Sequence, residues 1–142
     1  MARVVGLDIG ERRIGVAISD ATGTLARPLR VLVRGGSDAD ALRLVADEIA
    51  RLATEEDGLA AIVVGLPRRL DGTPNEMTPR VQAFAEQLRA ASRLPVVLQD
   101  ERLSSREAES RLALRDKDWR SRKKKLDAAA AAIVLQDYLD SR

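Results

Sequence analysis

The sequence contains no cysteine and no histidine among its 142 residues. These absences exclude disulfide bonds, zinc sites built from cysteine or histidine, cysteine nucleophiles and any Ser-His-Asp arrangement within the chain. If the protein is an enzyme, its chemistry therefore depends on carboxylates, Lys and Arg, hydroxyl groups or a cofactor. Carboxylates favour hard cations that prefer oxygen ligands, such as Mg²⁺ or Mn²⁺.

Long apolar stretches are lacking as well. The sequence has no run of about 18 apolar residues, so we expect no membrane contact. The first residues read directly as a strand, without the pattern of a signal peptide, and we therefore expect a cytoplasmic location. The composition, 45% hydrophobic and 32% charged, is ordinary for a globular protein, and the length predicts one domain over residues 1–142.

Basic residues are distributed unevenly along the chain. The net charge is only +2, yet residues 115–125 include seven Lys and Arg against two Asp. A charge run of this kind most often forms a solvated surface loop. The alternative is a contact with a phosphate backbone. Trp119, inside this segment, either stacks on a base or packs against its own domain.

The hydrophobic pattern predicts three consecutive strands, followed by strands that alternate with helices. We expect strands at residues 4–10, 13–19, 29–33, 59–66 and 95–99, and a last helix over about residues 124–139. This order predicts an α/β fold with a five-stranded mixed sheet, made of a three-strand antiparallel meander and two parallel strands, with helices on both faces. In such sheets ligands bind beyond the carboxyl ends of the parallel strands.

Capping residues mark the expected helix starts. Ser37 or Asp38 is expected to cap the helix after the third strand. Thr78 is expected to be the N-cap of the next helix, with Pro79 at its first position. Ser104 begins a capping-box pattern, which predicts a short helix after the fifth strand.

Asp8 lies in an otherwise apolar strand, and a buried charge needs a partner. Strand alternation places Asp8 on the same face as Gly6 and Gly10. The next strand has a face of small residues, Gly15, Ala17 and Ser19. If these faces align, they leave open space around Asp8 for an ion and a phosphate backbone. The alternative is that the glycines relieve helix packing and that Asp8 caps a turn.

Glu101 follows the fifth strand, at the predicted carboxyl edge of the sheet. Alternation allows only one of Asp100 and Glu101 to point at a site there. Glu101 lies on the more polar face of the strand, so we expect Glu101 to be the site residue. The alternative is a surface acid that pairs with Arg102 or Arg106.

Asp127 stands near the start of an alanine-rich helix that can approach a sheet closely. It lies one helical turn from Lys123, so a surface ion pair is the alternative to a site role. Asp8, Glu101 and Asp127 together would repel one another and raise one another's pKa, and one or two divalent cations would relieve that repulsion. Metal ions held by carboxylates are a common apparatus for phosphodiester hydrolysis.

Four segments of the chain resemble the YqgF/RuvX proteins, a branch of the ribonuclease H-like superfamily related to the RuvC Holliday-junction resolvases. They occur in the family's order and together span nearly the whole chain. The segments are GLDIGERRIGVAISD, IVVGLPRRLDGTPNEMTPRVQAFAEQL, QDERLSSREAE and KKKLDAAAAAIVLQDYL.

The resemblance implies a ribonuclease H-like fold and a nuclease that processes the 5′ end of precursor 16S ribosomal RNA. It implies Asp8, Glu101 and Asp127 as the catalytic and metal-binding acids, with Mg²⁺ or Mn²⁺ as the cofactor. The loop at residues 67–79 and the basic segment before the last helix offer candidate phosphate contacts. These nucleic-acid-binding candidates are Arg68, Arg69, Lys123, Lys124 and Lys125.

Three rival functions remain open from the sequence. Sugar kinases, actin and heat-shock chaperones use a similar Asp-x-Gly strand and turn to hold a nucleotide, but they need two such domains. A Holliday-junction resolvase would act on branched DNA instead of RNA, normally as a homodimer rather than a monomer. A ribosome-assembly factor would bind nucleic acid without cleaving it.

Overall fold

The computed structural model describes residues 2–101 and 119–142, with side chains for residues 2–101 and 128–142. In this part of the chain the strands are β1 (Arg3–Ile9), β2 (Arg13–Ser19), β3 (Ala26–Val33), β4 (Leu59–Leu66) and β5 (Val96–Asp100). The helices are α1 (Asp38–Ala53), α2 (Met77–Ser92) and α4 (Trp119–Ser141). None of these helices is long and apolar enough to cross a membrane.

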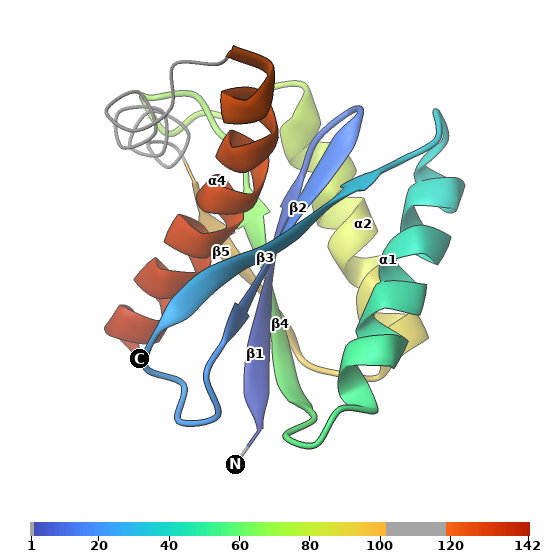
Figure 1. Cartoon of the computed structure of the whole chain (residues 1–142). Helices are drawn as coiled ribbons and strands as arrows, with labels where there is room; N and C mark the ends of the chain where they lie inside the picture. Colours follow the sequence, from blue (N-terminus) through green and yellow to red (C-terminus); the bar gives the residue numbers. More distant parts are fainter. Residues whose placement is uncertain (1, 102–118) are drawn as a thin grey trace.

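The strands form one five-stranded sheet in the order β3-β2-β1-β4-β5. β1 pairs with β2, and β2 with β3, in antiparallel fashion, whereas β1–β4 and β4–β5 are parallel. Helices α1 and α2 cover one face of the sheet, and α4 covers the other (Figure 1). The predicted mixed sheet with helices on both faces is therefore confirmed.

The face under α1 and α2 holds the larger apolar cluster. Side chains alternate along β1, and Val5, Leu7 and Ile9 belong to one buried cluster with Val45 of α1 and Phe84 of α2. Each fully buried side chain of this size contributes roughly 1.5–3 kcal/mol. This face accordingly provides most of the apolar stabilisation of the described fold.

The face under α4 is lined by smaller side chains. Val4 and Ala17 from the sheet cluster with Ala131, Val134 and Leu135 from the helix. The alanines of α4 present little volume, so the helix axis can lie close to the sheet. The register pairs β1 and β2 as the alternation predicted, because Asp8 lies opposite Gly15 and Gly6 lies opposite Ala17.

The two glycines that flank Asp8 have structural causes of their own. A Cβ atom on Gly6 would lie 2.8 Å from the Cβ of Leu135 and 3.1 Å from the carbonyl oxygen of Ala131, so Gly6 permits the close approach of α4. A Cβ on Gly10 would lie 2.7 Å from the carbonyl oxygen of Arg13. That oxygen accepts a hydrogen bond from the Gly10 N–H at 2.9 Å, which closes the β1–β2 hairpin. The alternative that the glycines relieve helix packing therefore holds for Gly6, and space for an ion at Asp8 stays a prediction.

Element boundaries differ from the predicted ones at β3 and α4. β3 begins at Ala26 and includes Pro28. Proline lacks an N–H group, and β3 tolerates it because it is an edge strand, one side of which forms no hydrogen bonds with another strand of the sheet. α4 begins at Trp119, several residues before the predicted start. The N-cap of α1 is confirmed as Ser37, whose hydroxyl accepts a hydrogen bond from the Asp40 N–H at 3.1 Å.

The predicted N-cap of α2 is wrong. The helix begins at Met77, and the Asn75 side chain accepts hydrogen bonds from the N–H groups of Met77 at 2.9 Å and Thr78 at 3.0 Å. Thr78 instead donates its hydroxyl to the Pro67 carbonyl and thereby fastens the start of α2 to the end of β4. The short helix predicted from Ser104 lies outside the described residues.

Candidate active site

The carboxyl ends of β1, β4 and β5 meet at one edge of the sheet. Leu66 at the end of β4 pairs with Asp100 at the end of β5, and the Glu101 N–H donates to the Leu66 carbonyl at 3.2 Å. Asp8 stands near the end of β1, the strand on the other side of β4. The edge that the strand order predicts for a ligand site therefore carries Asp8 and Glu101.

The structure brings the side chains of Asp8 and Glu101 into direct contact. The two carboxyls lie within hydrogen-bonding reach of each other. Burial raises the pKa of the Glu101 carboxyl far above its ordinary value, and the negative charge of Asp8, the shared hydrogen bond and the charge of Asp100 raise it further. Glu101 thus lies beside Asp8 at this edge of the sheet, and its catalytic and metal-binding role stays a prediction.

One oxygen of this pair has no hydrogen-bond partner in the part of the chain that the structure describes. This oxygen, Glu101 Oε2, is buried. A buried polar atom without a partner is costly and needs an explanation, such as a bound ion. The side chains described in residues 2–101 and 128–142 include no group of three acids placed to hold a metal ion.

Gly65 makes room for the Glu101 side chain, a role that sequence reasoning missed. A Cβ on Gly65 would lie 2.6 Å from Glu101 Oε2 and 3.3 Å from the Cγ2 of Val134. Any larger residue in this register position of β4 would push the Glu101 carboxyl out of its place. A glycine that interrupts an apolar strand next to a predicted site was the available clue.

Asp127 lies on α4, one turn before Ala131, and its side chain is outside the described part of the structure. One turn corresponds to about 6 Å along the helix axis. Ala131 contacts Gly6, and Asp8 lies two residues, or about 6–7 Å, further along β1 toward the carboxyl edge. α4 starts at that same edge (Figure 1), so Asp127 lies nearer to this edge than Ala131 does. Its part in the site stays a prediction.

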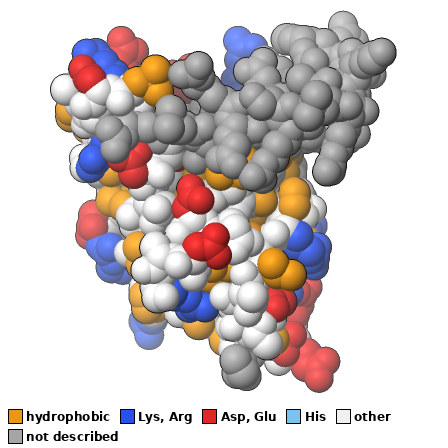
Figure 2. Space-filling view, turned by 90° about the vertical axis from the view of Figure 1, so that its left-hand side faces the viewer, with side chains coloured by type: hydrophobic (Ala, Val, Ile, Leu, Met, Phe, Trp, Pro, Cys, Tyr) orange, Lys and Arg blue, Asp and Glu red, His pale blue; other side chains and the backbone are white. Residues whose placement is uncertain are grey.

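The structure describes the side chains of only some of the basic residues predicted to bind nucleic acid. Arg68 lies at the same edge as the acids and forms an ion pair with Asp100, with 3.7 Å between Nη1 and Oδ2. Arg69 lies in the turn that follows β4. Lys123, Lys124 and Lys125 belong to α4, and their side chains are outside the described residues. On the α4 face, acidic side chains lie near the middle of the view and basic ones mainly toward its margins (Figure 2).

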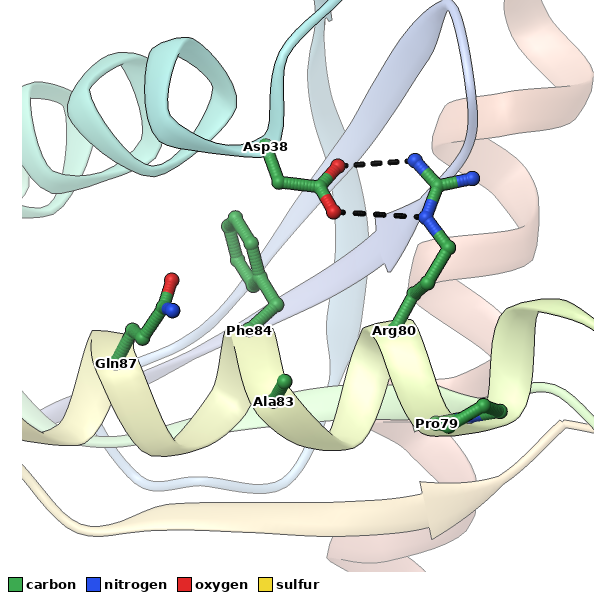
Figure 3. Close-up of a pocket in the computed structure, with 6 residues that line it drawn as sticks. All are labelled: Asp38, Pro79, Arg80, Ala83, Phe84 and Gln87. Atoms are coloured by element: carbon green, nitrogen blue, oxygen red, sulfur yellow. Dashed lines mark hydrogen bonds and ion pairs between the residues drawn. The ribbon is translucent and has the colours of Figure 1, made fainter.

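A second charged cluster lies on the other side of this sheet edge, and sequence reasoning missed it. Asp38 at the start of α1 receives two hydrogen bonds from Arg80 of α2, at 2.9 and 3.4 Å (Figure 3). It receives a third from Arg34 at 2.7 Å. These bonds, with that of Arg80 the stronger, lower the pKa of Asp38 to about 2. The carboxylate of Asp38 is thus paired with two guanidinium groups.

Arg34 connects this cluster to the turn that follows the Asp8 strand. Its side chain is only 1% exposed and donates to the Gly10 carbonyl at 3.0 Å as well as to Asp38. Arg80 also lies 3.5 Å from Glu11 in the same turn. A cavity of about 270 Å³ lies beside the cluster, between the start of α1 and the outer face of α2. It is lined by Asp38, Pro79, Arg80, Ala83, Phe84 and Gln87.

The sheet order and the helices on both faces define the class of this protein as a ribonuclease H-like fold. The comparisons with known proteins agree. The chain belongs to the RuvX family, because the model of that family, described as "Holliday junction resolvase", matches residues 2–141. The predicted family resemblance is confirmed.

Relatives of similar length share about two fifths of the sequence. A protein of Desulforudis audaxviator is 41% identical over 99% of this chain and 95% of its own length. One from Symbiobacterium thermophilum is 44% identical over 99% of this chain and 93% of its own length. Both are named "Putative pre-16S rRNA nuclease". These names and the family agree on a nuclease, a hydrolase that acts on nucleic acid.

Solved structures support the fold. RuvC of T. thermophilus in complex with a Holliday junction substrate has a TM-score of 0.57 at 16% identity and covers 100% of this chain and 96% of that one. A glucomannokinase from Arthrobacter has a TM-score of 0.50 at 18% identity, and the match covers 78% of this chain but only 49% of the kinase. At these identities the likeness concerns the fold alone.

Proposed function

We propose that this protein is a metal-dependent nuclease that hydrolyses phosphodiester bonds at the 5′ end of precursor 16S ribosomal RNA. The observation that carries the proposal is the contact between Asp8 and Glu101 at the carboxyl edge of the sheet. Two carboxyls in contact stabilise no fold by themselves, because each disfavours the charge of the other. Their juxtaposition is explained by something positive that binds both.

The residues present fit a hard divalent cation. The donors are carboxylate oxygens, which Mg²⁺ and Mn²⁺ prefer, and Glu101 Oε2 is buried without a hydrogen-bond partner in the described part of the chain. Asp8 and Glu101 would hold the ion, with Asp127 as the third ligand. When bound, one or two such ions supply a water of lowered pKa and stabilise the charge that develops on the phosphate oxygens.

The other candidate residues would bind and orient the nucleic acid strand. Arg68 and Arg69 at the end of β4, and Lys123, Lys124 and Lys125 at the start of α4, would contact phosphates on either side of the acids. RNA is favoured as the substrate because the relatives with about 40% identity are named for precursor 16S ribosomal RNA. The oligomeric state, monomer or homodimer, stays open, and the cytoplasmic location stays a prediction from the sequence.

A second candidate function is the cleavage of four-way DNA junctions. The description of the family model and the similarity of fold to RuvC favour it. A junction resolvase must cut two strands symmetrically, so this function requires a homodimer. Sedimentation or light scattering of the protein on a junction substrate would separate the two candidates, since the RNA function sets no such requirement.

The test is a cleavage assay with two substrates, a precursor RNA that contains the 5′ end of 16S ribosomal RNA and a four-way DNA junction, each with Mg²⁺ or Mn²⁺. The variants Asp8→Asn and Glu101→Gln are expected to lose cleavage. Glu56→Gln serves as the matched control, because Glu56 is an exposed acid in the turn before β4, at the opposite end of that strand. Equal cleavage by Asp8→Asn and the wild type would overturn the catalytic assignment of Asp8, whereas no cleavage by the wild type would leave a protein that binds nucleic acid without cutting it.

A further inference from the structure

The loop between β4 and α2 presents a large apolar side chain to solvent. Leu70 is 59% exposed, and it lies at the tip of a turn directly after Arg68 and Arg69. Single exposed leucines are common on protein surfaces. The case for a function therefore rests on how this turn is built and where it lies.

Hydrogen bonds fix the turn that carries Leu70. The Gly72 N–H donates to the Arg69 carbonyl at 2.8 Å, and the Arg69 N–H donates to the Thr73 carbonyl at 2.9 Å. The Asp71 carboxylate accepts from the Thr73 hydroxyl at 2.7 Å and from its N–H at 3.0 Å. Gly72 has a φ of +89°, a conformation that glycine adopts without strain. Leu70 is thus held outward by an ordered turn, so a contact made there costs little conformational entropy.

The turn lies beside the carboxylate pair. Leu66, four residues before Leu70, accepts the hydrogen bond from the Glu101 N–H. Four residues span at most about 13 Å of chain, which corresponds to about four stacked nucleotides at 3.4 Å each. Figure 1 shows this loop at the same end of the sheet as the β1–β2 hairpin and the start of α4. Leu70 is therefore within reach of a strand whose phosphate lies at the acids.

The other exposed hydrophobic residues differ in position. Among the described residues, the large exposed apolar side chains are those of Leu25, Val33 and Leu70. Leu25, which is 67% exposed, lies in the β2–β3 connection at the opposite end of the sheet (Figure 1). Val33 ends the edge strand β3, away from β4 and β5. Leu70 alone of these three follows basic residues at the edge where the acids meet.

We propose that Leu70 contacts the face of an unpaired base within about four nucleotides of the bond to be cleaved. The inference rests on the proposed nuclease function and names a determinant of its substrate. Apolar side chains of this size can displace a base from its neighbour in the stack. Such a contact tolerates any base sequence, but it requires a strand that is unpaired at that position. Leu70 thus makes the protein select single-stranded RNA ends over continuous duplex.

The test measures binding in an Asp8→Asn background, where no cleavage interferes. The probes are a short single-stranded RNA with one 2-aminopurine, placed at successive positions, and the same RNA in a full duplex. Leu70→Ala is expected to weaken binding of the single strand about tenfold, the effect of losing a buried leucine contact. It should also abolish the 2-aminopurine fluorescence change at one or two positions and leave duplex binding unchanged. Leu70→Met should restore both.

Two control variants separate this contact from charge and from general stability. Leu25→Ala removes an equally exposed leucine and is expected to change nothing. Arg69→Ala should lower the slope of binding affinity against salt concentration, whereas Leu70→Ala should leave that slope unchanged because it removes no charge. If Leu70→Ala binds every probe as Leu25→Ala does, the proposal is overturned.

The failure of the nuclease function has a different signature. If the wild type cleaves no substrate but Leu70→Ala still weakens binding of the single strand, the base contact holds and the catalytic proposal falls. If the wild type cleaves and Leu70→Ala neither weakens binding nor changes the preference for unpaired ends, the catalytic proposal holds and the base contact falls.

Discussion

Two groups of charged residues lie at the same edge of the sheet, on opposite faces, and they are built on opposite principles. Asp38 is held by Arg80 and Arg34, and these bonds lower its pKa to about 2. Glu101 is held against Asp8, another acid, and burial together with that charge raises its pKa. The first group satisfies its own charges and fastens the fold. The second brings two acids together, an arrangement that fits the cation site of the proposed function.

The largest expected effect comes from removing one acid of the pair formed by Asp8 and Glu101. Asp8→Asn and Glu101→Gln should each lower the cleavage rate by at least roughly 10²-fold, the size found when one preorganised electrostatic group is lost. In the absence of divalent metal the same variants should melt at an equal or higher temperature, because a repulsion is removed. Calorimetric melting beside the cleavage assay checks both, and a marked loss of stability would mean that the pair is structural.

The second effect concerns the space beside Glu101. Gly65→Ala should lower cleavage because its new Cβ displaces Glu101 Oε2, and it should change the stability of the fold little because the far end of the glutamate side chain can move. Gly36→Ala is the matched control, since a Cβ there meets nothing within 4 Å. Urea unfolding with the cleavage assay measures both changes. Normal activity in Gly65→Ala would show that Glu101 needs no fixed position.

The third effect concerns the group around Asp38. Arg34→Met should destabilise the fold by about 1–3 kcal/mol, because the Gly10 carbonyl and Asp38 both lose a buried donor. Residual cleavage by the folded fraction should fall much less than in Asp8→Asn. Urea unfolding measures the loss of stability, and a cleavage assay at a temperature well below melting measures the activity of the folded protein separately. A variant that stays fully stable but is inactive would place Arg34 with the catalytic group instead.

The smallest effect is a dependence of stability on pH. The pKa of Asp38 lies at about 2, below its ordinary value of 3.8. Its ion pairs therefore add stability that is complete above about pH 4 and is lost as the pH falls toward about 2. Asp38 is 47% exposed, so solvent screens the contribution to about 0.5 kcal/mol. Asp38→Asn should lower the free energy of unfolding at neutral pH, and urea unfolding should show a smaller loss of stability between about pH 4 and pH 2 than in the wild type. An equal loss in both proteins would contradict the role of Asp38 in this pH dependence.

The sequence predicted the features that depend on local patterns. The alternation of β1 placed Asp8 on the face opposite Leu7, and the register of β1 and β2 aligned their small-residue faces. The strand and helix order gave the sheet topology. These predictions succeeded because each depends only on the spacing of apolar residues along one element.

The features that sequence reasoning missed depend on contacts between distant segments. Gly65 makes room for the side chain of Glu101, and Thr78 binds the carbonyl of Pro67 instead of capping its own helix. The pairing of Asp38 with Arg80 joins α1 and α2, which precede and follow β4 in the sequence and lie on the same face of the sheet. No local pattern encodes such pairings, because they depend on how the elements pack.

The contact between Asp8 and Glu101 also has a consequence for the order in which the protein acquires its activity. Asp8 is among the first residues synthesised, whereas Glu101 joins it only after β5 has docked beside β4. Contacts between residues so far apart in sequence form late in folding, because a long loop must close first. A partly synthesised or partly folded chain therefore carries one acid without its partner. On the proposed function, the two acids are therefore brought together only in a chain whose sheet includes β5.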